Sequence, residues 1–231
     1  MEKQSLTSKK TAFIQWWKWL SVILIFYTLI AGLLIDVPRL PILHESIRNL
    51  FFHVTMWFSM LIMMIASVVY GIRYLRSGKI TNDIKAEKCV QSGIFLGILG
   101  LLTGSIWAKF TWGAWWVNDA KLNGAAASML VYLAYVILRG AMDDEHKRAR
   151  ISAVYSIFAF TLMIVFIMIL PRLTDSLHPG NGGNPGFGAY DLDSGMRTVF
   201  YPAVIGWALL AAWITEIRVR MKYIHHKKEN S

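Results

Sequence analysis

Six stretches of the chain contain no Asp, Glu, Lys or Arg and consist mainly of apolar residues. Each is 17 to 24 residues long, and about 20 helical residues cross the hydrocarbon core of a bilayer. None shows the period-two alternation of a transmembrane β-strand. The sequence therefore predicts an all-α, polytopic integral membrane protein with six transmembrane helices, at about residues 19–35, 49–72, 90–108, 122–138, 151–171 and 198–217.

Composition supports one membrane domain. Hydrophobic residues make up 55% of the chain and charged residues only 16%, against about 25% charged in ordinary soluble proteins. We expect a membrane domain at 19–217 between an amino-terminal tail, 1–18, and a carboxyl-terminal tail, 218–231. The single cysteine, Cys89, excludes an intramolecular disulfide and a cysteine-based zinc site.

The basic residues predict the orientation of the helices. Eighteen of the 24 Lys and Arg lie in the two tails and in the connections after the second and fourth helices. Short cytoplasmic loops retain Lys and Arg, so both termini are expected in the cytoplasm. The net charge of +10 is then a signal of topology, and no nucleic-acid partner is expected. The other six basic residues are Arg39, Arg48, Lys109, Lys121, Arg172 and Arg197.

A tryptophan cluster stands out in the second predicted outer loop, residues 109–121. Trp112, Trp115 and Trp116 precede Asp119. They can be interfacial anchors, as tryptophans at membrane surfaces commonly are. If the segment is helical, their spacing places all four residues on one face, and this face would suit a flat, conjugated ligand.

Two histidines are predicted on the same side of the membrane. His53 lies about one turn inside the second helix, and His178 lies in the third outer loop, 172–197. A lone histidine is usually structural, but two neutral imidazoles converging from opposite sides suit the axial positions of haem iron. Zinc is an alternative that needs three or four protein ligands, and His44 would supply a third.

The tryptophan loop also carries a resemblance to a known family. Residues 112–122, WGAWWVNDAKL, resemble the WWD signature W-G-x-x-W-x-W-D-x-R-L of haem-handling proteins in cytochrome c assembly. Residues 53–57, HVTMW, are similar to the family's H-V-P-x-x-W. Together with the six-helix length, these motifs identify a resemblance to the CcmC family. The chain departs from the pattern at Thr55, Asn118 and Lys121, which replace Pro, Trp and Arg.

The resemblance implies a site and a function. Haem b would bind at the outer face, with His53 and His178 as axial iron ligands and with Trp112, Trp115, Trp116 and Asp119 forming the WWD platform. CcmC-like proteins deliver haem to the chaperone CcmE and work with CcmA, CcmB and CcmD, the partners of an ABC transporter complex. The implied location is the bacterial inner (plasma) membrane, with the haem site facing the periplasm. The chain would position haem rather than act as an enzyme in its own right.

Two other classes of function stay open on the sequence. An electron-transfer subunit like cytochrome b holds haem between histidines inside its helices, and here His53 is the only histidine within a predicted span. A cofactor-free transporter permease would carry ionisable residues along a substrate path. His53 near a helix end offers little of either pattern.

Overall fold

The computed structural model describes residues 15–40, 42–178 and 192–229, with side chains up to residue 224. Among these residues, six helices are long and apolar enough to cross a membrane, which confirms the predicted fold class. Most of the amino-terminal tail and the Gly- and Pro-rich part of the third outer loop lie outside the described residues. The helices are α2 (Trp16–Leu34), α3 (Leu50–Ser77) preceded by the 3-10 turn η1 (His44–Asn49), α4 (Ile80–Trp112), α5 (Ala120–Gly140), α6 (Glu145–Ile164), which continues through the π-helical turn η2 (Val165–Ile169) into α7 (Leu170–Leu173), and α8 (Ser194–Glu229).

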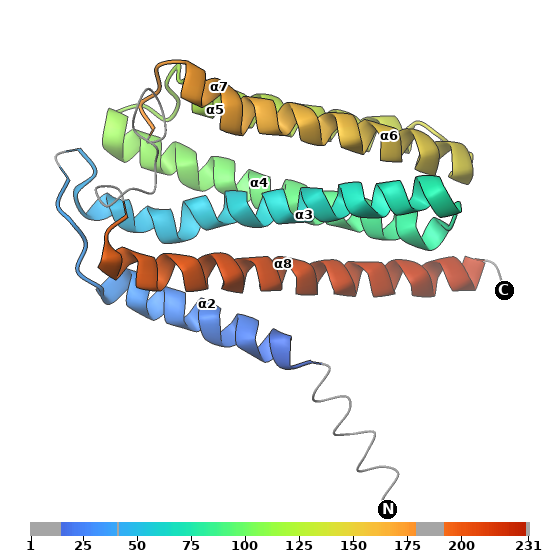
Figure 1. Cartoon of the computed structure of the whole chain (residues 1–231), viewed down its shortest axis with the longest axis horizontal. Helices are drawn as coiled ribbons and strands as arrows, with labels where there is room; N and C mark the ends of the chain where they lie inside the picture. The colour runs from blue at the N-terminus through green and yellow to red at the C-terminus, as the bar shows by residue number, and fades with distance from the viewer. Residues whose placement is uncertain (1–14, 41, 179–191, 230–231) are drawn as a thin grey trace, which may run out of the picture.

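The helices form one bundle with two distinct ends. Helices α3, α4 and α8 lie together, α5 and α6 flank them on one side, and α2 packs against α8 on the other (Figure 1). The end of α8 and the α3–α4 and α5–α6 turns lie at one end of the bundle, which we call the terminus end, and α2 begins partway along α8 on the side toward this end. Residues 36–49, 113–119 and 174–178 meet at the opposite end, which we call the loop end.

Glycine and aspartate residues set the helix boundaries. Helix α3 ends where Gly78 adopts a φ of 64° and donates its N–H to the Tyr74 carbonyl at 2.8 Å. Gly113, with a φ of 78°, also adopts the left-handed conformation and ends α4. Asp119 and Asp144 accept backbone N–H groups at the starts of α5 and α6. Helices α3 and α4 extend beyond the charge-free stretches, so that only residues 78–79 connect them.

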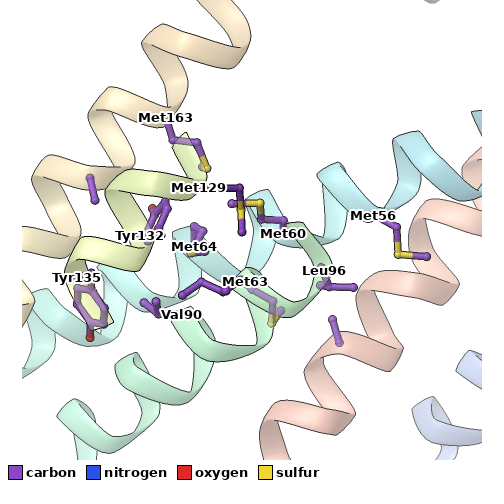
Figure 2. Packing of buried hydrophobic residues seen from close by; sticks show 13 residues of the cluster. Met56, Met60, Met63, Met64, Val90, Leu96, Met129, Tyr132, Tyr135 and Met163 are labelled. Atoms are coloured by element: carbon purple, nitrogen blue, oxygen red, sulfur yellow. The ribbon is translucent and has the colours of Figure 1, made fainter. Parts of the chain in front are cut away.

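The centre of the bundle is built from methionines packed against glycines. Met60, Met64 and Met129 lie with other buried methionines between α3, α5 and α6 (Figure 2). A Cβ atom at Gly93 would lie 2.6 Å from the Met64 methyl carbon, and one at Gly97 would collide with the Met129 sulfur. These glycines therefore let flexible methionines fill the space between closely packed helices.

The terminus end holds a buried ion cluster. The Arg139 guanidinium on α5 donates two hydrogen bonds to the Asp83 carboxylate on α4, at 2.8 and 2.5 Å. It also reaches Glu87 at 3.4 Å. The ion pair links α4 to α5, and both of its side chains are nearly inaccessible to solvent. Removal of either one would leave a buried, unpaired charge and destabilise the bundle.

Candidate functional site

Asp119 has two structural tasks at the loop end. Its Oδ1 atom accepts the backbone N–H groups of Lys121 at 2.9 Å and Leu122 at 3.2 Å, which caps α5. Its Oδ2 atom accepts the Ser176 hydroxyl at 2.8 Å and the Leu177 N–H at 2.7 Å. The carboxylate therefore ties the start of α5 to the segment that leads into the third outer loop.

The same carboxylate orients His178. The His178 Nδ1 atom lies 3.0 Å from Asp119 Oδ1, and the Asp119 side chain is only 1% exposed. Burial alone would raise the pKa of Asp119, but hydrogen bonds from His178, Leu177 and Ser176 outweigh it and hold that pKa well below its usual value. Because an ionised carboxylate only accepts, the proton between the two groups lies on Nδ1. With the Nδ1 proton facing Asp119, Nε2 is the ring nitrogen left to face a ligand.

His53 is oriented in a comparable way by α4. Its Nδ1 atom lies 3.0 Å from the Thr103 hydroxyl oxygen. That hydroxyl donates its one hydrogen to the Leu99 carbonyl at 2.8 Å, with the Gly100 carbonyl 3.2 Å away. The hydroxyl oxygen must therefore accept from Nδ1–H of His53, and Nε2 again carries the free lone pair.

Packing also restricts the His53 ring. Trp57 and Trp107 contact it edge-on, with ring centroids 6.5 and 5.8 Å away. A Cβ atom at Gly104 would lie 2.6 Å from His53 Cε1. The ring therefore has space only because residue 104 is a glycine. His53 lies one turn into α3, at the loop end of the bundle, where residues 174–178 also lie.

The tryptophans do not share a helical face, which corrects that conditional expectation. Gly113 ends α4 directly after Trp112, and the chain is not helical again until α5. Trp112 contacts the His178 ring at 5.0 Å between centroids, whereas Trp115 and Trp116 are 59% and 43% exposed. The loop thus divides into one tryptophan that packs on a histidine and two that present open apolar surface.

Contacts from α4 and α5 hold this exposed loop in place. Ser105 donates to the Trp115 carbonyl at 2.7 Å, and the Lys109 ammonium donates to the Gly113 carbonyl at 2.8 Å. The Trp116 indole N–H donates to the Asn123 side chain at 3.2 Å. Asn123 in turn donates to Asn118 at 2.7 Å, so the residue that replaces the family tryptophan belongs to a polar network.

The six basic residues on this side differ in their partners. Most of them are engaged: Arg48 with Glu45, Lys109 with Gly113, Arg172 with Met168 and Arg197 with Leu192, while Lys121 has contacts of its own. Arg39 is exposed and has no hydrogen bond or ion pair among the described residues. It is therefore the cation most open to an added anion.

The zinc alternative lacks its third ligand. His44 is exposed on η1, where it has a φ of 44°. Across the described part of the chain, no group of three or more His, Cys, Asp and Glu side chains is arranged to hold a metal ion. The structure therefore brings Asp119, Trp112 and His178 into contact and places His53 at the same end of the bundle, and among the described residues His44 joins no group of possible metal ligands.

Sequence reasoning missed the residues that orient the histidines. Thr103 and Ser176 belong to no motif, and each is distant along the chain from the residue it contacts. Asp119 is expected as part of the haem platform, which stays a prediction; in the structure it is buried and makes five contacts that tether α5 to residues 176–178. Residue spacing within one helix does not predict such contacts, because they join different segments of the chain.

Comparison with known proteins gives a consistent picture. The family model described as CcmC, "Heme exporter protein C", matches residues 2–231. "Heme exporter protein C" of Escherichia coli strain K12 is 28% identical over 180 residues, which are 76% of this chain and 70% of the relative. The protein of the same name from Haemophilus influenzae is 28% identical over 137 residues, 57% of this chain and 53% of the relative. "Cytochrome c biogenesis protein CcsA" of Prochlorococcus marinus is 31% identical over 88 residues, 38% of this chain and 28% of the relative.

Proposed function

The chain belongs to the CcmC family of heme exporter proteins, and on that premise we propose that it holds haem b at the loop end and presents it to a haem chaperone. It is an integral membrane protein with a role in cytochrome c maturation. This family membership favours haem delivery over the electron-transfer and permease alternatives. Haem is the cargo in this proposal, and the chain's own residues supply position and electrostatics.

The observation that carries the proposal is the matched orientation of the two histidines. In each, Nδ1 faces a protein acceptor, Asp119 for His178 and Thr103 for His53. Each imidazole therefore keeps Nε2 available as a ligand to iron, and its outer partner fixes the ring. His53 and His178 are the proposed axial ligands.

The two ligands are not equivalent. His178 is backed by a carboxylate, whereas His53 is backed by a neutral hydroxyl. His53 is set in a helix among aromatic rings, and His178 is held to the bundle through Asp119. Release of haem to a chaperone would then proceed by loss of the contacts of the 176–178 segment, with His53 as the fixed ligand.

The exposed tryptophans and Arg39 complete the proposed cargo site. Trp115 and Trp116 offer aromatic surface, and one aromatic contact contributes about 0.5–1.5 kcal/mol beyond area burial. Trp112 would support the His178 ring. Arg39 is the proposed partner for a haem propionate, since its guanidinium is exposed and suited to bidentate pairing with a carboxylate.

The proposed partners and location follow from the family and the charge distribution. We propose a CcmE-like chaperone as the recipient and CcmA-, CcmB- and CcmD-like subunits as neighbours, in the bacterial inner (plasma) membrane. The excess of Lys and Arg at the terminus end supports cytoplasmic termini and a loop end that faces the periplasm.

Absorption spectroscopy of the purified, haem-loaded protein tests the ligand assignment. Wild type is expected to show six-coordinate, low-spin haem. His53→Ala and His178→Ala should each shift the spectrum toward that of high-spin haem, because one strong axial ligand is lost. His44→Ala and His146→Ala are matched controls, because His44 is exposed and joins no group of possible ligands among the described residues, and His146 lies by Tyr74 at the terminus end. An unchanged low-spin spectrum in the His53→Ala/His178→Ala double variant would overturn the assignment.

Co-purification tests delivery separately. A tagged CcmE-like chaperone should retain this chain more strongly when haem is loaded, and Trp115→Ala/Trp116→Ala should reduce that retention. Retention that is identical with and without haem, in wild type and variant alike, would reject delivery while leaving the histidine assignment intact.

A further inference from the structure

A shallow surface depression lies at the terminus end of the bundle, at the opposite end from His53 and His178. It has a volume of about 330 Å³ between α4 and α8. Its lining consists of three basic side chains, one amide and one methionine: Lys88, Gln91, Arg218, Met221 and Lys222. We call it the basic groove.

Two of its cations lack a protein counter-ion. Arg218 and Lys222 are half-buried, and neither forms a hydrogen bond or ion pair with any residue that the structure describes. Lys88 differs, since its ammonium lies 3.1 Å from the Glu87 carboxylate. Partly desolvated, unpaired cations favour an anion in the space between them.

The nearby carboxylate does not fill this role. Glu87 already accepts from the Lys88 ammonium, from the Gln91 amide at 2.9 Å and from Arg139. Its charge is thus offset within α4 and α5. The charge that remains uncompensated in the groove is positive, on α8.

The groove lies where the apolar part of the bundle stops. The charge-free stretches begin at Val90 on α4 and end at Thr215 on α8. Lys88 and Arg218 lie just beyond these limits, at the depth of the lipid headgroups. On the orientation proposed above, this is the cytoplasmic leaflet.

An exposed apolar strip leads from the groove into the membrane. Phe95, Ile98 and Leu102 on α4 are 45%, 43% and 57% exposed. Their spacing from Lys88 and Gln91 places all five residues on one face of the helix. A ligand with an anionic head and a hydrocarbon tail would match both parts of this surface.

We propose that the basic groove binds the phosphate headgroup of an anionic phospholipid, with an acyl chain along Phe95, Ile98 and Leu102. The Arg218 guanidinium offers paired donors to phosphate oxygens, and Lys222 adds a point charge. Basic pockets between transmembrane helices on the cytoplasmic side are suited to such headgroups. The proposal concerns a different end of the molecule from the haem site and does not depend on haem binding; only the choice of leaflet rests on the orientation proposed above.

Native mass spectrometry with defined lipids tests the proposal. The full-length protein is titrated with phosphatidylglycerol or phosphatidylcholine, and the retained lipid is counted. Wild type should retain phosphatidylglycerol in preference to phosphatidylcholine. Arg218→Gln/Lys222→Gln should weaken phosphatidylglycerol binding about 20- to 30-fold, from about 1 kcal/mol for each basic residue.

A matched pair of charges provides the control. Arg76→Gln/Lys79→Gln removes one Arg and one Lys from the same end, at exposed positions outside the groove, and should retain wild-type binding. Arg218→Lys should retain most of it, and an unchanged size-exclusion elution profile and unfolding temperature in detergent verify folding of every variant. If both double variants lose the same amount of phosphatidylglycerol binding, the effect is one of overall charge. If inorganic phosphate at equal concentration displaces phosphatidylglycerol, the groove is a phosphate site. Either result overturns the proposal.

Discussion

At the scale of single residues, Asp119 differs most from its expected role. As the last residue of a tryptophan motif it was expected to border a ligand platform. In the structure it is buried, caps α5 and binds the backbone and side chains of residues 176–178. A carboxylate that hydrogen-bonds to an iron-ligating imidazole affects the imidazole directly and the haem only through it. The effect of Asp119 on haem is therefore expected to pass through His178.

Substitution of Asp119 tests this tether. Asp119→Asn retains the size of the side chain but removes the negative charge that His178 faces, so haem affinity should fall about 10- to 100-fold. Haem titration, followed by the fraction of six-coordinate iron, measures the change. Asp175→Asn removes an exposed carboxylate from the same segment and should leave affinity unaltered. If the two variants behave alike, Asp119 does not act through His178.

Thr103 gives a second test at this scale. Thr103→Val preserves the shape of the side chain but removes the acceptor for His53 Nδ1. We expect weaker haem binding and a loss of about 1 kcal/mol of stability, typical of a lost hydrogen bond. Thr111→Val is the control, because its hydroxyl bonds only to its own helix, at the Trp107 carbonyl. Equal haem affinity in both variants would contradict the proposed role of Thr103.

At the scale of elements, α4 organises the site. Its glycines admit the side chains of α3, its threonine orients His53, and its last turn begins the tryptophan loop. Helix α5 approaches α6 equally closely, because a Cβ atom at Gly124 would collide with the Phe166 carbonyl in the π-helical turn. Close approach between these helices therefore depends on small residues at a few positions.

Gly104 is the position where helix packing and the site meet. Gly104→Ala places a methyl group against His53 and should cost about 1–3 kcal/mol of overpacking, partly offset by the higher helix propensity of alanine. It should also displace the His53 ring and alter the haem spectrum. Gly71→Ala is the control, since its Cβ would meet Ala153 at an ordinary 3.5 Å. Thermal unfolding in detergent and the haem spectrum measure both effects, and a normal spectrum in Gly104→Ala would show that the ring has other space.

At the scale of the whole molecule, the bundle separates two chemical environments. The loop end gathers histidines and tryptophans, while the terminus end gathers the ion cluster and the basic groove. The charge-free stretches between them keep the two ends on opposite sides of a membrane. Orientation then decides which compartment each environment faces.

Cysteine labelling tests that orientation. In a Cys89→Ala background, Arg39→Cys at the loop end should react with a membrane-impermeant maleimide in spheroplasts. Arg76→Cys at the terminus end should react only after permeabilisation. Both introduced cysteines occupy exposed positions, and replacing the buried native Cys89 leaves each variant with a single thiol to label. The reverse labelling pattern would place the termini outside the cytoplasm.

The sequence by itself determined the class of fold, the number of spanning helices and the family. Apolar runs of bilayer length and the WWD motif are local patterns, and local patterns can be recognised without knowledge of tertiary contacts. The sequence also marked His53, His178 and the tryptophans as candidates, because their residue types are unusual at a membrane surface.

Only the tertiary structure decided how these candidates are held. The end of α4 at Gly113 separated the tryptophans, and packing between helices paired Asp119 with His178 and Thr103 with His53. The groove at Arg218 and Lys222 likewise requires α8 to lie against α4. A hydrogen bond depends on distances of about 3 Å between atoms that lie 50 or more residues apart in the chain, and no residue pattern along the sequence encodes such distances.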